Sequence, residues 1–162
     1  MSSSLKNLSD FSLIKVANAS NYKFAIVVSQ WNSQVTGALL QGAFDSLISH
    51  GALEQNIKLI EVPGSFELVS GSDLALKDAS IDAVITLGCV IQGETRHFDF
   101  ICNAVANGIA QVSIKYNKPV IFGVLTTDNL QQALDRSGGK HGNKGEEAAV
   151  TAIQMAQISA NS

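Results

Sequence analysis

Four mostly apolar runs, each followed by a stretch with helical periodicity, constrain the fold of this chain more than any other feature. The runs are residues 24–28 (FAIVV), 57–62 (IKLIEV), 81–87 (IDAVITL) and 119–125 (PVIFGVL). Apolar runs of this length are typical of strands that are buried on both faces of a sheet. Strands that alternate with helices through right-handed crossovers form a parallel sheet with helices on both faces. The sequence therefore predicts a three-layer α/β protein with four parallel strands.

The segments between these runs predict the helices. Ser65 and Asp128 are the expected N-caps of two of them, and Gly51 is a stop signal for the first. The strongest stripe of apolar residues at helical spacing runs from Phe98 to Tyr116. The expected helices are 40–48, 65–77, 98–116, 128–136 and 146–157.

The beginning of the chain differs from the rest. We expect residues 1–10, which are serine-rich, to be a flexible N-terminus without a secretory signal, and residues 11–162 to form a single domain. Residues 11–16 (FSLIKV) partly alternate and predict a short strand that has no partner nearby in the sequence. Such a strand can add to a sheet edge, including the edge of a neighbouring subunit.

Composition limits the classes of function. Charged residues make up 15% of the chain, which is low, so part of the surface is expected to be covered by other subunits. The formal net charge of −3 argues against nucleic acid as a partner, and no apolar run approaches the length of a membrane span. Cys89 and Cys102 lack the C-x-x-C spacing of a metal site, so we expect no metal there. Buried free thiols fit a reducing compartment.

The stretch from residue 88 to residue 97 (GCVIQGETRH) carries the strongest indication of a ligand site. We expect 88–95 to be a loop at the carboxyl end of the third strand, where open α/β sheets bind ligands. Gly93 allows close backbone approach, Thr95 offers a hydroxyl, and the N–H groups of the next helix start are free, which together make an anion site. His97 lies beside it and can titrate near neutral pH.

Other segments are expected to meet this loop at the same rim, since the carboxyl ends of parallel strands lie together. Trp31 and Phe66 stand among polar residues there and are natural stacking platforms. Walker A and G-x-G-x-x-G motifs are absent, and no Ser/His/Asp order supports covalent catalysis. The residues alone indicate a rim suited to a planar, phosphate-bearing small molecule. The contributing segments are 29–32, 63–67, 88–97, 126–128 and 136–145.

Each candidate also has a plain structural explanation. A histidine such as His97 is more often structural than functional, and Arg136 could cap a helix C-terminus. Lys144 could be a solvated lysine, and the two aromatic residues could belong to the core. The glycine-rich segment 136–145 is explained as well by a connector as by an anion site.

Five motifs occur in an order and spacing that resembles the 6,7-dimethyl-8-ribityllumazine synthase family. The likeness covers residues 11–158, and the motifs are specific in register although each alone is weak. It implies a flavodoxin-like subunit that condenses 5-amino-6-ribitylamino-pyrimidinedione with 3,4-dihydroxy-2-butanone 4-phosphate, without metal or cofactor. Imine formation, phosphate elimination and ring closure then give the lumazine of riboflavin biosynthesis. The motifs are 31–32 (WN), 63–68 (PGSFEL), 88–100 (GCVIQGETRHFDF), 122–127 (FGVLTT) and 142–145 (GNKG).

The resemblance also implies roles for individual residues. His97 would carry protons, Arg136 and the turn at 93–95 would bind phosphate, and Lys144 would add positive charge. The aromatic residue at position 31 would stack on the pyrimidine, and Phe122 would reach in from a neighbouring subunit. His97 and Arg136 are the implied catalytic residues. The residues implied to bind substrate are Trp31, Asn32, Ser65, Phe66, Glu67, Leu68, Val90, Ile91, Gly93, Glu94, Thr95, Phe122 and Lys144.

Three residues depart from the pattern of the family. Trp31 stands where phenylalanine is commoner, and Val69 replaces a frequent proline. Gln92 stands where a basic residue is frequent, which would weaken phosphate affinity. None of these changes removes a group with an implied catalytic role.

The resemblance extends to assembly and partners. It implies a homopentamer, and the compact length of the segment from Arg136 to Lys144 is similar to that of members that form 60-subunit icosahedral capsids. Riboflavin synthase is an implied partner, and the location is the cytoplasm or, for a mature plastid form, the plastid. Two rival interpretations use the same scaffold: a noncatalytic flavin- or lumazine-binding protein, and a structural shell protein.

Overall fold

The computed structural model of the protein describes residues 7, 9–11 and 16–162, and its centre is a four-stranded parallel sheet in the order β2-β1-β3-β4. All three strand pairs are parallel, as the sequence predicts. The strands are β1 (Phe24–Ser29), β2 (Ile57–Val62), β3 (Ala83–Ile91) and β4 (Val120–Thr127).

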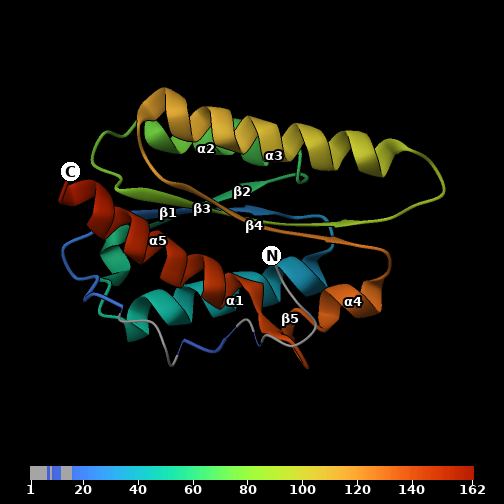
Figure 1. Ribbon diagram of the computed structural model, residues 1–162, viewed down its shortest axis with the longest axis horizontal. Coiled ribbons are helices and arrows are strands. Elements are labelled where there is room, and N and C mark those ends of the chain that lie inside the picture. The colour runs from blue at the N-terminus through green and yellow to red at the C-terminus, as the bar shows by residue number, and fades with distance from the viewer. Residues whose placement is uncertain (1–6, 8, 12–15) are drawn as a thin grey trace.

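Helices cover both faces of this sheet, so the predicted three-layer, flavodoxin-like α/β architecture is confirmed. Helices α2 and α3 lie on one face, and α1, α4 and α5 lie on the other (Figure 1). A short antiparallel hairpin of β5 (Ser137–Gly139) and β6 (Gly142–Asn143) connects α4 to α5. The helices are α1 (Ser33–Ser49), α2 (Leu68–Leu76), α3 (His97–Tyr116), α4 (Leu130–Leu134) and α5 (Lys144–Ala160).

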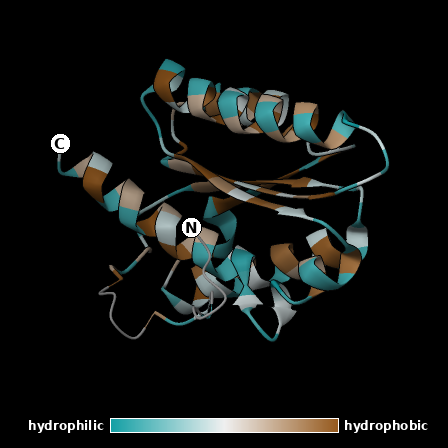
Figure 2. Ribbon diagram, turned by 45° about the vertical axis from the view of Figure 1, so that its right-hand side comes forward, coloured by the Kyte–Doolittle hydropathy of each residue, from teal (hydrophilic) through white to brown (hydrophobic). Residues whose placement is uncertain are grey.

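The sheet has an apolar core on each face, and this explains why β1 lacks polar alternation. Phe24, Ile26 and Val28 point into the core shared with α1 and α5, whereas Ala25 and Val27 point into the core shared with α2 and α3. Figure 2 shows the hydrophobic colours concentrated on the strands, between helices of mixed polarity. Burial on two faces holds β1 and most of β3 at the centre of the sheet, and the carboxyl ends of the parallel strands lie along one rim.

The third strand is longer than the sequence predicts. The segment 88–91, expected to be part of a loop, continues β3 and pairs in register with residues 124–127 of β4. Cys89, Val90 and Ile91 continue the apolar pattern, and they find partners because β4 extends to Thr127. The loop before α3 is therefore 92–96 rather than 88–95.

The first predicted N-cap is wrong. Helix α2 begins at Leu68, and Glu67 occupies its N-cap position instead of Ser65. The Leu68 N–H donates to the backbone carbonyl of Ser65, so the expected cap residue is part of the preceding turn. The Glu67 carboxylate accepts from the N–H of Gly64 at 3.0 Å and closes that turn, which delays the helix.

The second predicted N-cap is displaced by one residue. Asn129, not Asp128, caps α4, and its side chain accepts from the Gln132 N–H at 3.0 Å. Asn129 has the extended backbone that an N-cap requires. The Asp128 carboxylate instead accepts from the side-chain amide of Gln132 at 3.3 Å.

The strand expected at 11–16 falls mainly on residues 12–15, which lie outside the described residues. Its two ends, Phe11 and Val16, are not in a strand. Ser9 contacts the hairpin, since its Oγ accepts from the N–H of Asn143 at 2.9 Å. The division into a flexible residue 1–10 segment and one domain from residue 11 stays a prediction.

Candidate active site

A cavity of about 490 Å³ opens where the carboxyl ends of β1, β2 and β3 meet the start of α3. It lies at the rim that the sequence indicates, and it gathers most of the residues expected around the heterocycle. The expected site residues that line it are Trp31, Asn32, Ser65, Phe66, Glu67, Val90, Ile91 and His97.

The end of β1 forms one wall of this cavity. The backbone N–H of Trp31 donates to the carbonyl of Pro63 at 3.1 Å, which ties the turn that follows β1 to the end of β2. Asn32 has a left-handed backbone (φ 59°), a conformation that asparagine tolerates better than most residues. Its Nδ2 donates to the carbonyl of Cys89 at 3.0 Å, so the same turn is also tied to β3. The indole of Trp31 is 72% exposed, which excludes the core alternative.

The turn between β2 and α2 forms the opposite wall. Phe66 is 53% exposed and its ring is available for contact with a ligand, whereas Ser65 is buried beneath it. A Cβ on Gly88 would lie 2.7 Å from Ser65 Oγ and 2.8 Å from Leu68 Cδ1. Gly88 therefore serves the packing of these two side chains against β3. Leu68 is fully buried, so contact between its side chain and substrate stays a prediction.

The loop before α3 carries the expected anion-binding residues, and it projects from one end of the sheet (Figure 1). Gly93, Glu94 and Thr95 are all exposed, and a Cβ on Gly93 would meet no atom within 4 Å. Thr95 Oγ1 accepts from the N–H of His97 at 3.4 Å, so the hydroxyl lies at the start of α3. The cavity wall and the helix start meet at His97, the first residue of α3.

The cavity is also lined by three residues that were not predicted as site residues from the sequence: Gly64, Cys89 and Ile101. Ile101 lies one helical turn after His97, so helical spacing from the histidine could have identified it. Burial raises the pKa of the Cys89 thiol to about 11, so this thiol stays neutral at physiological pH. A nucleophilic role for Cys89 is therefore unsupported.

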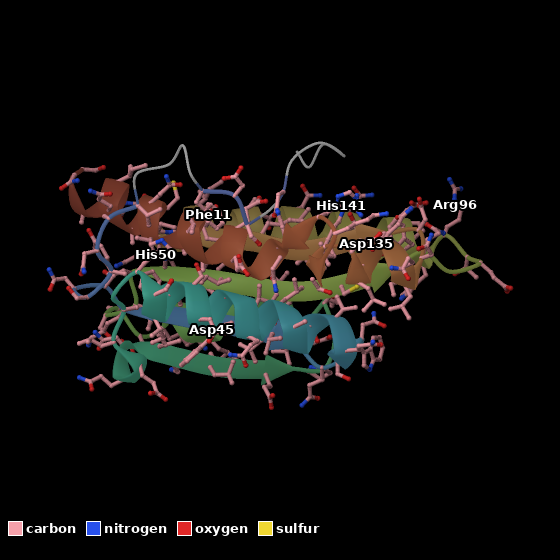
Figure 3. The ribbon with its side chains drawn as sticks, turned by 90° about the horizontal axis from the view of Figure 1, so that it is seen from below. Phe11, Asp45, His50, Arg96, Asp135 and His141 are labelled. Atoms are coloured by element: carbon pink, nitrogen blue, oxygen red, sulfur yellow. The ribbon has the colours of Figure 1, made fainter. Side chains whose placement is uncertain are left out.

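The two expected cations do not line this cavity. Arg136 Nη1 donates to the backbone carbonyl of Gln132 at 3.1 Å, which is the helix-capping contact weighed as its structural alternative. Lys144 Nζ lies 2.6 Å from the Glu147 carboxylate in the first turn of α5. Both belong to the α4, hairpin and α5 side of the sheet, where Figure 3 also places Asp135 and His141. In that view Arg96, which precedes α3, projects from the end of the molecule.

Arg136 and Lys144 are nevertheless brought side by side by a hydrogen bond between their backbones. The Lys144 N–H donates to the carbonyl of Arg136 at 2.8 Å, at the open end of the β5–β6 hairpin. Phe122 also lies outside the cavity, on β4, and is 37% exposed. Among the described residues β4 pairs only with β3, so Phe122 stands on an edge strand.

Two features of the described part of the chain bear on other classes of site. No group of three or more His, Cys, Asp or Glu side chains gathers there in a way that could hold a metal ion. None of the helices in the described ranges has the length and apolar character that crossing a membrane requires.

An open parallel sheet with an aromatic-walled cavity at its carboxyl edge defines a flavodoxin-like protein that binds small molecules. The family model of 6,7-dimethyl-8-ribityllumazine synthase matches residues 21–160. The chain is 58% identical over 155 residues to the 6,7-dimethyl-8-ribityllumazine synthase of Cytophaga hutchinsonii, covering 96% of this chain and 97% of the relative. It is 50% identical to that of Phocaeicola vulgatus, with 96% and 92% covered, and 48% identical to that of Parabacteroides distasonis, with 99% and 100% covered. The chain belongs to the 6,7-dimethyl-8-ribityllumazine synthase family.

Proposed function

We propose that this protein catalyses the condensation of 5-amino-6-ribitylamino-pyrimidinedione with 3,4-dihydroxy-2-butanone 4-phosphate to 6,7-dimethyl-8-ribityllumazine, releasing phosphate. The observation that carries the proposal is the cavity, in which the aromatic, carboxylate and imidazole groups of the family motifs face one space. A neutral Cys89 thiol also favours a reaction between two bound substrates over covalent catalysis by the protein.

In this proposal the cavity binds the pyrimidine. The exposed indole of Trp31 stacks on the ring, which is worth about 0.5–1.5 kcal/mol beyond burial. Val90 and Ile91 contact the heterocycle from β3, and the turn of Phe66 and Glu67 holds the ribityl chain. Leu68 contributes through the backbone at the start of α2.

The phosphate of the second substrate binds at the loop before α3. The exposed turn at 93–95 supplies donors, and the dipole of α3, which begins at His97, favours an anion there. Arg136 and Lys144 complete the site from a neighbouring subunit, because within one chain their side chains contact Gln132 and Glu147 instead of the cavity. Phe122 reaches the same site from its edge strand.

His97 moves the protons of the reaction. The amino group of the pyrimidine attacks the ketone of the butanone phosphate, water leaves to form the imine, phosphate is eliminated, and ring closure follows. Each step needs a proton carrier near pH 7, and an imidazole at the cavity wall is suited to that. Holding both substrates together supplies several kcal/mol more, in the range known for oriented reactants.

The direct test is to incubate the protein with both substrates and to follow the absorbance of the lumazine product. We expect product to form with release of one phosphate per turnover. The rate of product formation should be far lower when His97 is replaced by alanine. Saturable binding of flavin or lumazine without turnover would contradict the proposal and would favour the noncatalytic binding protein.

The proposed site requires at least two subunits, and we propose that the chain forms a homopentamer that can assemble further into a 60-subunit shell. The low charge content and the open edge of β4 support this. Light scattering that gives a monomer at micromolar concentration would contradict both assemblies. We place the enzyme in the cytoplasm, where riboflavin synthase is the partner that would consume its product.

A further inference from the structure

Asn143 joins three elements on the α1 and α5 side of the sheet. It ends β6, occupies the N-cap position of α5 and is 6% exposed. Its Oδ1 accepts from the N–H of Gly145 at 2.8 Å, and its Nδ2 donates to the carbonyl of Ala38 in α1 at 3.0 Å. Few side chains this short can accept and donate at the same time, and an asparagine amide is one of them.

Two glycines provide the space for this contact. A Cβ on Gly42 in α1 would lie 2.5 Å from Asn143 Nδ2, and a Cβ on Gly145 would overlap the carbonyl oxygen of Leu39. Glycine inside a helix is less stable than alanine, so α1 is locally weakened where Asn143 docks. The contact between Asn143 and α1 therefore depends on a glycine in each of the two helices, Gly42 in α1 and Gly145 in α5.

Capping of α5 does not by itself require this arrangement. The Oδ1 bond to Gly145 would be supplied equally well by serine or aspartate, which are N-caps of similar strength. The Nδ2 bond to Ala38 contributes nothing to the cap, and Gly42 leaves room for the whole amide group that makes it. Its effect is to fix the position of the hairpin relative to α1.

The hairpin fixed in this way carries both cations of the proposed phosphate site. Asn143 pairs with Ser137 across the hairpin, and the next residue, Lys144, is bonded through its N–H to the carbonyl of Arg136. The Nδ2 bond to Ala38 thus sets where Arg136 and Lys144 stand on their own subunit, and with it how they are presented to the site of the neighbouring subunit.

We propose that Asn143 is a positioning residue for phosphate recognition. Through its bond to Ala38 it holds Arg136 and Lys144 where the phosphate of the butanone substrate binds, without touching that substrate. This inference rests on the proposed function, in which these two cations bind the phosphate.

The test compares kinetics of the assembled enzyme carrying Asn143→Ser with the unchanged enzyme. Serine keeps the cap to Gly145 but is too short to reach Ala38. Because a misplaced charged group loses much of its contact, we expect KM for the butanone phosphate to rise roughly five- to fiftyfold. We expect KM for the pyrimidine to change less than about twofold, since its cavity is formed by other elements. Equal changes in both KM values would overturn the positioning role.

Two controls separate positioning from folding. Ile153→Val removes a methylene from the buried face of the same helix, so it should lower the melting temperature without changing the ratio of the two KM values. Asn143→Asp keeps the cap and a side chain of the same length but loses the donor to Ala38, so it should raise KM for the butanone phosphate as Asn143→Ser does. An unchanged KM in Asn143→Asp would mean that the bond to Ala38 does not position the cations.

Arg136→Ala, measured in parallel, separates failure of this inference from failure of the proposed function. If Arg136→Ala leaves both KM values unchanged, the cations do not bind the phosphate, and the positioning role is refuted with that assignment. If Arg136→Ala raises KM for the butanone phosphate and Asn143→Ser does not, only the positioning role is refuted. If Asn143→Ser fails to fold, Asn143→Asp gives the same comparison, since aspartate keeps the cap and loses the donor.

Discussion

The two ends of the candidate site differ in how far one chain completes them. At the heterocycle end, hydrogen bonds from Trp31 to Pro63 and from Asn32 to Cys89 tie three strand ends together around a cavity. At the phosphate end, the cationic groups are present but engaged elsewhere, Arg136 with a helix carbonyl and Lys144 with a carboxylate. A single chain therefore shapes the cavity proposed for a planar ring, whereas the proposed phosphate site would need a second subunit and an exchange of existing contacts.

The largest effect is expected where the two ends meet, at His97. His97→Ala should lower kcat by about 10- to 1000-fold, the range of general acid–base contributions, with smaller changes in substrate affinity. Single-turnover measurements with both substrates bound would separate the chemical step from binding. Near-normal turnover in this variant would remove the imidazole from the mechanism.

Arg136→Ala addresses the phosphate end alone. Loss of a charge-assisted hydrogen bond to phosphate costs about 1.5–3 kcal/mol, which is roughly a 10- to 150-fold rise in KM for the butanone phosphate. Binding of the pyrimidine, measured separately by titration, should hardly change. A similar loss for both substrates would contradict the division between the two ends.

Trp31→Phe addresses the heterocycle end alone. The indole has a larger face than a phenyl ring, so this change should weaken flavin binding by about two- to tenfold and leave the reaction largely intact. In the unchanged protein, the only tryptophan should be quenched strongly and saturably by riboflavin. An emission that does not respond to saturating ligand would show that the indole does not stack.

The smallest effect is expected at the exposed loop before α3. Gly93→Ala has room for its Cβ in the free chain and should leave the melting temperature unchanged or slightly higher. It should raise KM for the butanone phosphate a few-fold, since a methyl group then stands where a phosphate approaches the backbone. Gly37→Ala in α1 also meets open space and is the matched control, for which neither KM should change. A Gly93→Ala enzyme with an unchanged KM would remove this loop from the phosphate site.

The sequence was sufficient for the sheet, its layers and the composition of the cavity wall. The continuous apolar run at 24–28 indicates burial on both faces, as β1 shows, and Trp31 could be identified as a rim aromatic because polar residues surround it. Gly88 was misjudged because what it accommodates, Ser65 and Leu68, comes from a distant segment that no local signal reveals. The N-cap of α4 was placed at Asp128 instead of Asn129 for a related reason. Both residue types can cap a helix, and only the backbone conformation selects Asn129.

The contacts of Arg136 could not be predicted for a different reason. A guanidinium beside a helix end serves equally as a cap or as a phosphate ligand, and the sequence is the same in both cases. Which one is observed depends on whether the anion and the neighbouring subunit are present. In the single chain the helix carbonyl of Gln132 is the available acceptor.

The Glu147 carboxylate, 2.6 Å from Lys144, is a counter-ion built into the chain. In the proposed site, a phosphate that approaches Lys144 would displace this carboxylate, so its net gain would be the difference between two ion pairs rather than the whole of one. The carboxylate would pair with the lysine again when inorganic phosphate leaves. A site arranged in this way would bind its anion less tightly and would release the leaving group more readily.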